Sequence, residues 1–280
     1  MNAFILDFEK KVKDSIKKYD LIIGNERIAV AISGGKDSTS LLYLLKKFGC
    51  NVFALFIDLK IKGNSDENLK RITAFCKKNC IELRIVDLKK EAGHSLLEIC
   101  RTYQKEHDST NCAICGAIKR HYLNKFAKKW GADKLATGHN LDDEAENLLL
   151  NIFSNNYDLC FGLGPGSVKD DVGLFIPRIK PLYDCLNSET EKYSRLMGFD
   201  IYPEICPLRA DAFRKDVRHM ISKIKNNDFL KRKLVNNFLD ILKKMPAKKF
   251  LGAVKCFECS EPSRKGLCKA CEILKFSKKR

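Results

Sequence analysis

Short apolar runs alternate along the chain with segments whose apolar residues recur every three or four positions. The run Ile28–Ile32 contains no polar residue, which is typical of a strand buried on both faces of a parallel sheet. Three further apolar-rich runs predict strands at 51–59, 81–88 and 134–137. The helical spacing predicts helices at about 4–18, 41–48, 65–79, 94–104 and 118–126, and from about 142.

Strands that alternate with helices predict an α/β fold, in which a Rossmann-like parallel sheet carries helices on both sides. The ligand of such a sheet lies beyond the carboxyl ends of its strands. Residues 155–173 are rich in Gly, Asn and Asp and predict an ordered loop or a short hairpin. We divide the chain into four parts: an N-terminal helical segment (1–23), an α/β domain (24–208), a basic helical region (209–252) and a small cysteine-rich module with a basic tail (253–280).

Composition indicates a nucleic-acid partner rather than a membrane. The formal net charge of +17 favours a polyanion, because each neutralised phosphate releases counterions; a solvated lysine-rich surface is the alternative. No apolar run approaches the length of a membrane span, and Asp7 and Glu9 interrupt the start, where a secretory signal is uncharged. A cytoplasmic protein is therefore expected. Its 13 cysteines then indicate metal or catalytic sulfur chemistry rather than disulfides.

A glycine-containing loop between the first strand and the next helix is typical of a phosphate-binding site. Gly34 and Gly35 allow backbone amides to approach an anion, and the helix N-terminus adds its positive dipole. Lys36 supplies positive charge, and Asp37 is a candidate magnesium ligand. The nucleotide-binding residues expected in this loop are Ser33, Gly34, Gly35, Lys36, Asp37 and Ser38. The alternative is a helix-capping turn, and the spacing differs from the loop that accompanies cleavage at the terminal phosphate of a mononucleotide.

The fourth predicted strand is followed by the polar sequence GHNLDDEAE, which starts at Gly138. Because the carboxyl ends of parallel strands meet at one edge, Gly138 and, after the second strand, Asp58 are expected beside the nucleotide. Asp143 and Glu146 share a helical face, which brings carboxylates near the nucleotide and its metal. Acidic charge that suits a helix N-terminus is the alternative. We favour Asp143, together with Asp37, as the catalytic carboxylates.

A mid-chain pair, Cys112 and Cys115, has the spacing of a metal or redox site. A third cysteine, Cys206, lies between prolines that stiffen its backbone, and a packed core thiol is the alternative for it. Three thiolates would leave one iron of a four-iron cluster without a protein ligand. That open position resembles the fourth site of a catalytic zinc, which holds the nucleophile.

The C-terminal module contains two Cys-x-x-Cys pairs separated by eight residues. This pattern predicts a closed tetrahedral zinc site of the structural type. A module of about twenty residues cannot build a core of its own, so the metal is expected to supply much of its folding free energy. The predicted zinc ligands are Cys256, Cys259, Cys268 and Cys271.

With these motifs in order, the chain resembles the two-thiouridine synthetase family of tRNA-thiolating enzymes, the TtuA-like group, over about residues 24–273. Its glycine loop resembles the PP-loop of the ATP pyrophosphatases, which release pyrophosphate and leave AMP on the activated substrate. The group also shares the Cys-x-x-Cys pair, the GHNxDD segment, a late Cys-Pro, a terminal zinc ribbon and an R-x-K-P-L stretch, here Arg178–Leu182. The group normally begins with a second zinc ribbon, whereas no cysteine precedes Cys50 here. A helical segment takes that place.

The resemblance implies ATP-dependent 2-thiolation of a tRNA uridine, with magnesium and zinc as further cofactors. It implies that Cys112, Cys115 and Cys206 hold a 4Fe-4S cluster and that Lys119 and Asp143 lie at the active site, with Lys119 next to the nucleotide. Its implied partners are tRNA and a sulfur donor, either free sulfide or a thiocarboxylated ubiquitin-like carrier. Homodimers are common in the family, so the resemblance allows a homodimer here.

Two other functions fit parts of the pattern. A PP-loop ligase with a nitrogen nucleophile, of the lysidine-forming or amidotransferase type, would use the three cysteines as a structural zinc site. A tRNA-binding or sulfur-relay protein without catalysis would not need Lys36, Asp37 and Asp143, which are all present.

Overall fold

The computed structural model describes residues 2–61, 63, 65–167, 173–202, 206, 208, 212–244, 254–263 and 265–277. The strands are β1 Arg27–Ala31, β2 Asn51–Asp58, β3 Glu82–Asp87, β4 Lys134–Ala136, β5 Arg178–Ile179, β6 Val254–Lys255 and β7 Pro262–Ser263. The helices are α1 Ala3–Lys18, α2 Lys36–Lys47, α3 Ser65–Lys78, α4 Leu88–Ala92, α5 Leu96–Tyr103, α6 Asn111–Lys129, α7 Leu141–Phe153, α8 Tyr157–Cys160, α9 Asn187–Leu196, α10 Ala212–Lys223, α11 Asn227–Lys244 and α12 Lys269–Ser277.

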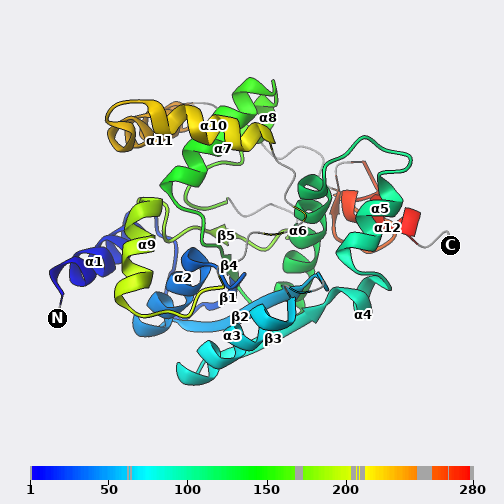
Figure 1. Ribbon diagram of the computed structural model, residues 1–280, viewed down its shortest axis with the longest axis horizontal. Helices are drawn as coiled ribbons and strands as arrows, with labels where there is room; N and C mark the ends of the chain where they lie inside the picture. The colour runs from blue at the N-terminus through cyan, green and yellow to red at the C-terminus, as the bar shows by residue number, and fades with distance from the viewer. Residues whose placement is uncertain are drawn as a thin grey trace.

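The main sheet has five parallel strands in the order β3-β2-β1-β4-β5, which confirms the predicted Rossmann-like α/β class (Figure 1). The strand order reverses between β1 and β4, and α/β sheets bind their ligands at such a switch point. The four predicted strands are present. The fifth, Arg178–Ile179, was not predicted, because two residues are too few to show a period.

Alternating residues of the strands enter two different cores. Ile28 and Val30 of β1 pack with α1, α2, α3 and α9 on one face. Ala29 of the same strand packs with α4, α5, α6 and the C-terminal cysteine module on the other face. The two-residue period of a strand explains this division, and it accounts for runs without polar positions.

Several predicted boundaries were wrong. The helix predicted at 118–126 begins earlier, at Asn111 with Thr110 as its N-cap, so Cys112 and Cys115 lie in its first turns. The segment 155–173 contains the short helix α8, and its residues 168–172 lie outside the described part. The basic helical region is two helices, α10 and α11, and the expected tail at 275–280 continues α12 to Ser277.

The helices α10 and α11 and the helix α12 of the cysteine-rich module lie on different sides of the main sheet (Figure 1). Helices α10 and α11 pack on α7, whereas α12 packs on α5 and α6. None of the helices in the described ranges combines the length and the apolar character that a membrane crossing requires.

Candidate functional site

The glycine loop Ser33–Ser38 connects the buried strand β1 to α2 at the carboxyl edge of the sheet. The Ser38 hydroxyl closes the loop: it accepts the Ser33 amide at 3.1 Å and lies 3.1 Å from the Gly35 carbonyl oxygen, to which it donates. Gly35 is the N-cap of α2 and makes no side-chain cap, so the first amides of the helix stay available to an anion. The Lys36 ammonium contacts both oxygens of Asp37 at 2.8 Å. The loop is therefore folded around an anion-binding helix terminus.

Gly34 has a φ of +82°, and a side chain there would collide with Asn68 of α3. Asn68 is buried and donates a hydrogen bond from its amide to the Ser33 carbonyl oxygen at 2.9 Å. Glycine is thus required at position 34 for two reasons: the backbone is left-handed there, and the Asn68 side chain occupies the space of a Cβ atom. Asn68 was missed in the sequence, because a helical Asn carries no spacing signal.

Gly138 brings the loop after β4 against the glycine loop. A Cβ atom at Gly138 would lie 2.8 Å from the Ser38 amide nitrogen and 2.9 Å from the Asp37 carbonyl carbon. Two backbones therefore touch at the switch point, which only glycine permits. The buried Asn140 continues the contact, since its amide donates to Asp37 Oδ1 at 3.2 Å.

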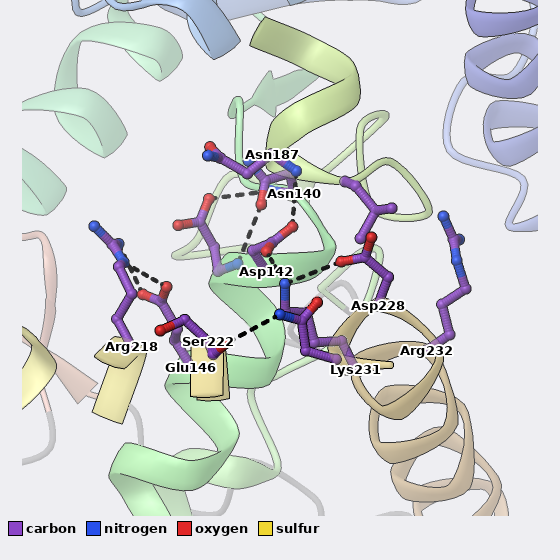
Figure 2. Close-up of polar contacts among 12 residues, drawn as sticks. Asn140, Asp142, Glu146, Asn187, Arg218, Ser222, Asp228, Lys231 and Arg232 are labelled. Atoms are coloured by element: carbon purple, nitrogen blue, oxygen red, sulfur yellow. Dashed lines mark hydrogen bonds and ion pairs between the residues drawn. The ribbon is translucent and has the colours of Figure 1, made fainter. Parts of the chain in front are cut away.

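Three of the four acids at the start of α7 are neutralised by ion pairs (Figure 2). Glu146 accepts two hydrogen bonds from Arg218 of α10, at 2.7 and 2.9 Å. Asp142 pairs with Lys231 of α11 at 2.6 Å, as Figure 2 shows, and Glu144 pairs with Lys180 at 2.6 Å. The expectation that Glu146 faces the nucleotide metal is therefore wrong, because its carboxylate, with 5% of its surface exposed, holds α10 on α7.

Asp143 is the remaining acid, and within the described ranges it has no ion-pair partner at salt-bridge distance. Its carboxylate accepts the Asn140 amide at 3.2 Å in a capping box, which fixes its orientation. Burial raises the pKa of Asp143 to about 6, and the negative charges of Asp37 and Glu146 raise it further against the Asn140 hydrogen bond. A half-buried carboxylate beside a second carboxylate is suited to bind a divalent cation or to accept a proton.

Cys112, Cys115 and Cys206 come together at the N-terminus of α6. Burial is the main cause that raises the pKa of Cys115, and the neighbouring Cys206 and Cys112 raise it as well. Lys119 opposes this shift, because its positive charge favours the thiolate form of Cys115. The three thiols thus lie close enough to act on one another's charge, and their shared cluster site stays a prediction; Cys206 is exposed, and Pro207 lies outside the described residues.

Two arginines lie on the side of α6 that carries Cys115. Arg120 approaches Gly116 in the turn that follows Cys115, and its charge acts on Cys115. Burial is the main cause that lowers the pKa of Arg178 in β5, and the positive charge of the nearby Arg120 lowers it further. The Tyr202 amide, four residues before Cys206, donates to the Gly34 carbonyl oxygen at 3.4 Å. The glycine loop thus contacts the segment that precedes Cys206 through a backbone hydrogen bond.

Asp58 lies at the carboxyl end of β2, as expected, but its carboxylate is buried and engaged. Lys60 pairs with it at 2.6 Å and also with Asp87 at 3.1 Å. Asp58 therefore orders the loop after β2, and a role toward the nucleotide stays a prediction.

The four cysteines of the C-terminal module converge on one point. The sulfur atoms of Cys256, Cys259, Cys268 and Cys271 all lie within 4.8 Å of one another. Backbone amides of Cys268 and Cys271 point at the sulfurs of Cys256 and Cys268, at 3.3 and 3.4 Å, which stabilises thiolates. Four convergent thiolates fit a structural zinc ion. Among the described residues, the sulfurs of Cys112, Cys115 and Cys206 are not as close together as the ligands of a single metal ion would be. A cluster of four irons requires a wider spacing between its cysteine ligands.

Comparison with known proteins identifies the family of this chain. The sequence profile of the PP-loop domain family matches residues 5–224. A tRNA-5-methyluridine(54) 2-sulfurtransferase from Pyrococcus horikoshii is 35% identical over 95% of this chain and 84% of its own length. A probable sulfurtransferase from Methanocaldococcus jannaschii is 30% identical over 97% of this chain and 80% of its own length. The solved structure of the U34-tRNA thiolase NcsA from Methanococcus maripaludis, with its [4Fe-4S] cluster, superposes with a TM-score of 0.82 at 28% identity, over 97% of this chain and 87% of that one.

Proposed function

This chain belongs to the PP-loop family of tRNA 2-sulfurtransferases, and from that premise we propose that it converts a tRNA uridine to 2-thiouridine at the expense of ATP. The observation that carries the proposal is the meeting of Cys112, Cys115 and Cys206 with Lys119, next to a glycine loop built to bind phosphates. A nucleotide loop alone is common to enzymes with many nucleophiles. The three thiols add the sulfur chemistry.

In the first step ATP binds at the N-terminus of α2, where Lys36 and the loop amides hold its phosphates. Asp143 and Asp37 are the residues that would hold magnesium, which would neutralise charge on the phosphates. The C2 oxygen of the uridine attacks the α-phosphorus of ATP, and the bond from that phosphorus to the pyrophosphate oxygen breaks. The poor leaving group at C2 is thereby converted to AMP.

In the second step a sulfide adds to C2, and AMP leaves with the former C2 oxygen. The cluster implied by Cys112, Cys115 and Cys206 would supply an iron with an open coordination position for this sulfide. Lys119 stabilises the negative charge that collects on the AMP phosphate next to the incoming sulfur. Zinc in the C-terminal ribbon has no part in the reaction, because its four thiolates fill the coordination sphere.

We expect the tRNA to reach this site by phosphate and shape contacts with lysines of α10 and α11, in the cytoplasm. The relatives act on different uridines by name, one at position 54 and one at position 34. Mass mapping of 2-thiouridine in tRNA from a deletion strain will identify the position that this chain modifies, and addition of free sulfide to the purified enzyme will test the sulfur donor.

The decisive experiment is purification without oxygen, followed by assay of iron, labile sulfide and tRNA thiolation. Cys112→Ala, Cys115→Ala and Cys206→Ala are each expected to abolish thiolation while ATP binding persists, whereas Cys80→Ala, at an exposed thiol, is the matched control. Retained thiolation in all three variants would refute the cluster role. Zinc without iron at these cysteines would instead support the ligase with a nitrogen nucleophile.

A further inference from the structure

The C-terminal ribbon is part of the core that carries the cysteine helix α6. Ile114, which stands between Cys112 and Cys115, is fully buried, and so is Ile118 one turn later. Both belong to the same hydrophobic cluster as Ile273 of α12 and the ribbon sulfurs of Cys256 and Cys268. The buried side of α6, against which Cys115 also packs, therefore belongs to one core with the ribbon, and Figure 1 shows α12 beside α5 and α6.

A buried polar contact joins the same helix to the ribbon. Asn124 of α6 is 4% exposed, and its amide donates to the carboxylate of Glu261, which lies in the ribbon and is 8% exposed. Asn124 Oδ1 accepts the Ile176 amide at 2.9 Å, two residues before Arg178. Glu261 is itself fixed by the ribbon backbone, because its carbonyl oxygen accepts the Cys256 amide at 2.8 Å. Asn124 thus ties α6, β5 and the zinc module together.

Two further contacts follow the same interface. His121 of α6 interacts electrostatically with the thiol of Cys268. On α5, the Tyr103 hydroxyl donates to Glu272 of α12 at 2.8 Å. His121 and Cys112 are nine residues apart on one helix, or about 14 Å at 1.5 Å per residue, so a rigid α6 connects the two thiol sites directly.

We propose that the metal-bound ribbon is the structural support of α6 and that zinc occupancy is coupled to the order of the Cys112–Ile118 turns. Its consequence for the cluster rests on the proposed function. A ribbon of about two dozen residues has no core of its own and loses order without its metal. Its loss removes Glu261 as the partner of Asn124 and part of the core that contains Ile114 and Ile118, so the turns that present Cys112 and Cys115 open more often. By linkage, a cluster bound to α6 in turn stabilises zinc binding.

The coupling is tested first in iron-free protein, by amide hydrogen exchange of the full chain before and after zinc removal with a chelator. Removal of zinc is expected to accelerate exchange at residues 112–118 by about tenfold or more, because buried apolar and polar contacts are lost together. Unchanged exchange there, with zinc shown by metal analysis to be absent, would overturn the inference. Failure of the wild-type protein to take up iron would instead overturn the cluster part of the proposed function and leave the exchange result standing.

A second variant keeps the zinc ligands and removes only the connection. Glu261→Ala is expected to retain full zinc content and to accelerate exchange at 112–118 several-fold, and the iron-loaded variant is expected to lose its visible cluster absorbance faster under a chelator. Glu258→Ala is the matched control, since Glu258 is exposed and pairs with Lys275 inside the ribbon at 2.9 Å. If both variants exchange like wild type at 112–118, the ribbon does not support α6 through this contact and the proposal is wrong.

Discussion

Replacement of Gly138 by alanine would place a methyl group inside the backbone of the glycine loop. The added carbon would lie 2.8 Å from the Ser38 amide nitrogen, 2.9 Å from the Asp37 carbonyl carbon and 3.1 Å from the Ser38 Cα atom. All three are backbone atoms, so no side chain can rotate away. The two loops must separate by roughly 0.6 Å to restore ordinary contact, and this displacement acts on the amides that face the phosphates.

Overpacking of a well-packed contact typically costs about 1–3 kcal/mol. If the folded protein adopts the displaced loop, that cost appears in nucleotide binding as a dissociation constant about 5- to 150-fold higher. If the loop resists, the cost appears in the free energy of unfolding. Titration calorimetry with ATP and urea unfolding of the same preparation measure both, and their sum is the quantity that the structure predicts.

Gly162→Ala is the control for this experiment. The nearest atom to a Cβ at Gly162 is the Leu159 carbonyl oxygen at 3.6 Å, which is an ordinary contact, so both measurements are expected to stay at wild-type values. A Gly138→Ala protein with wild-type ATP affinity and wild-type stability would show that the two loops do not touch as described.

Three further results are expected. The acid limb of activity should lie near pH 6, where Asp143 takes up a proton, and Asp143→Asn should abolish thiolation. Because the pKa of Asp143 is raised in the folded protein, the stability that this residue contributes falls as pH rises from about 4 to 6, so the Asn variant should resist urea better than wild type at pH 7. An unchanged pH dependence of stability would contradict this expectation. Arg218→Ala should lower the free energy of unfolding by about 1–3 kcal/mol, because the buried Glu146 loses its two hydrogen bonds. In the control variant Arg195→Ala, which removes an ion pair between side chains that are 79% (Arg195) and 54% (Glu191) exposed, the free energy of unfolding should change by no more than about 0.5 kcal/mol. Equal effects of the two variants would argue against burial as the cause. Asn68→Ala should weaken ATP binding by about fivefold through loss of one hydrogen bond to the glycine loop, and calorimetry that finds wild-type affinity would exclude its part in shaping the loop.

Local pattern predicted the parts of this molecule that depend on neighbours in the sequence. The strands β1 to β4, the glycine loop and the four ribbon cysteines all have a period or a spacing that physical chemistry links to one structure. Gly138 was expected near the nucleotide from the edge rule for parallel strands, and it lies against the glycine loop. Their assignment needed no knowledge of contacts between distant segments.

What could not be predicted depends on partners far apart in the chain. Asp143 and Glu146 share a helical face in the sequence, and the ion pair of Glu146 with Arg218 of α10 could not be predicted from it. Asn68 and Asn124 carry no motif, yet each makes buried hydrogen bonds to a distant segment. The two-residue strand β5 exists because β4 offers it an open edge.

The ion pairs between α7 and the helices α10 and α11 determine which cations of these helices are available to bind a nucleic acid. Arg218 and Lys231 already have carboxylates at 2.7 and 2.6 Å, so they are internal counterions of the protein and do not displace salt from a nucleic acid. Arg218 and Lys231 should therefore contribute little to the salt dependence of RNA affinity, which other lysines and arginines determine. The position of each cation, and not only the formal charge, decides whether it can contact a phosphate.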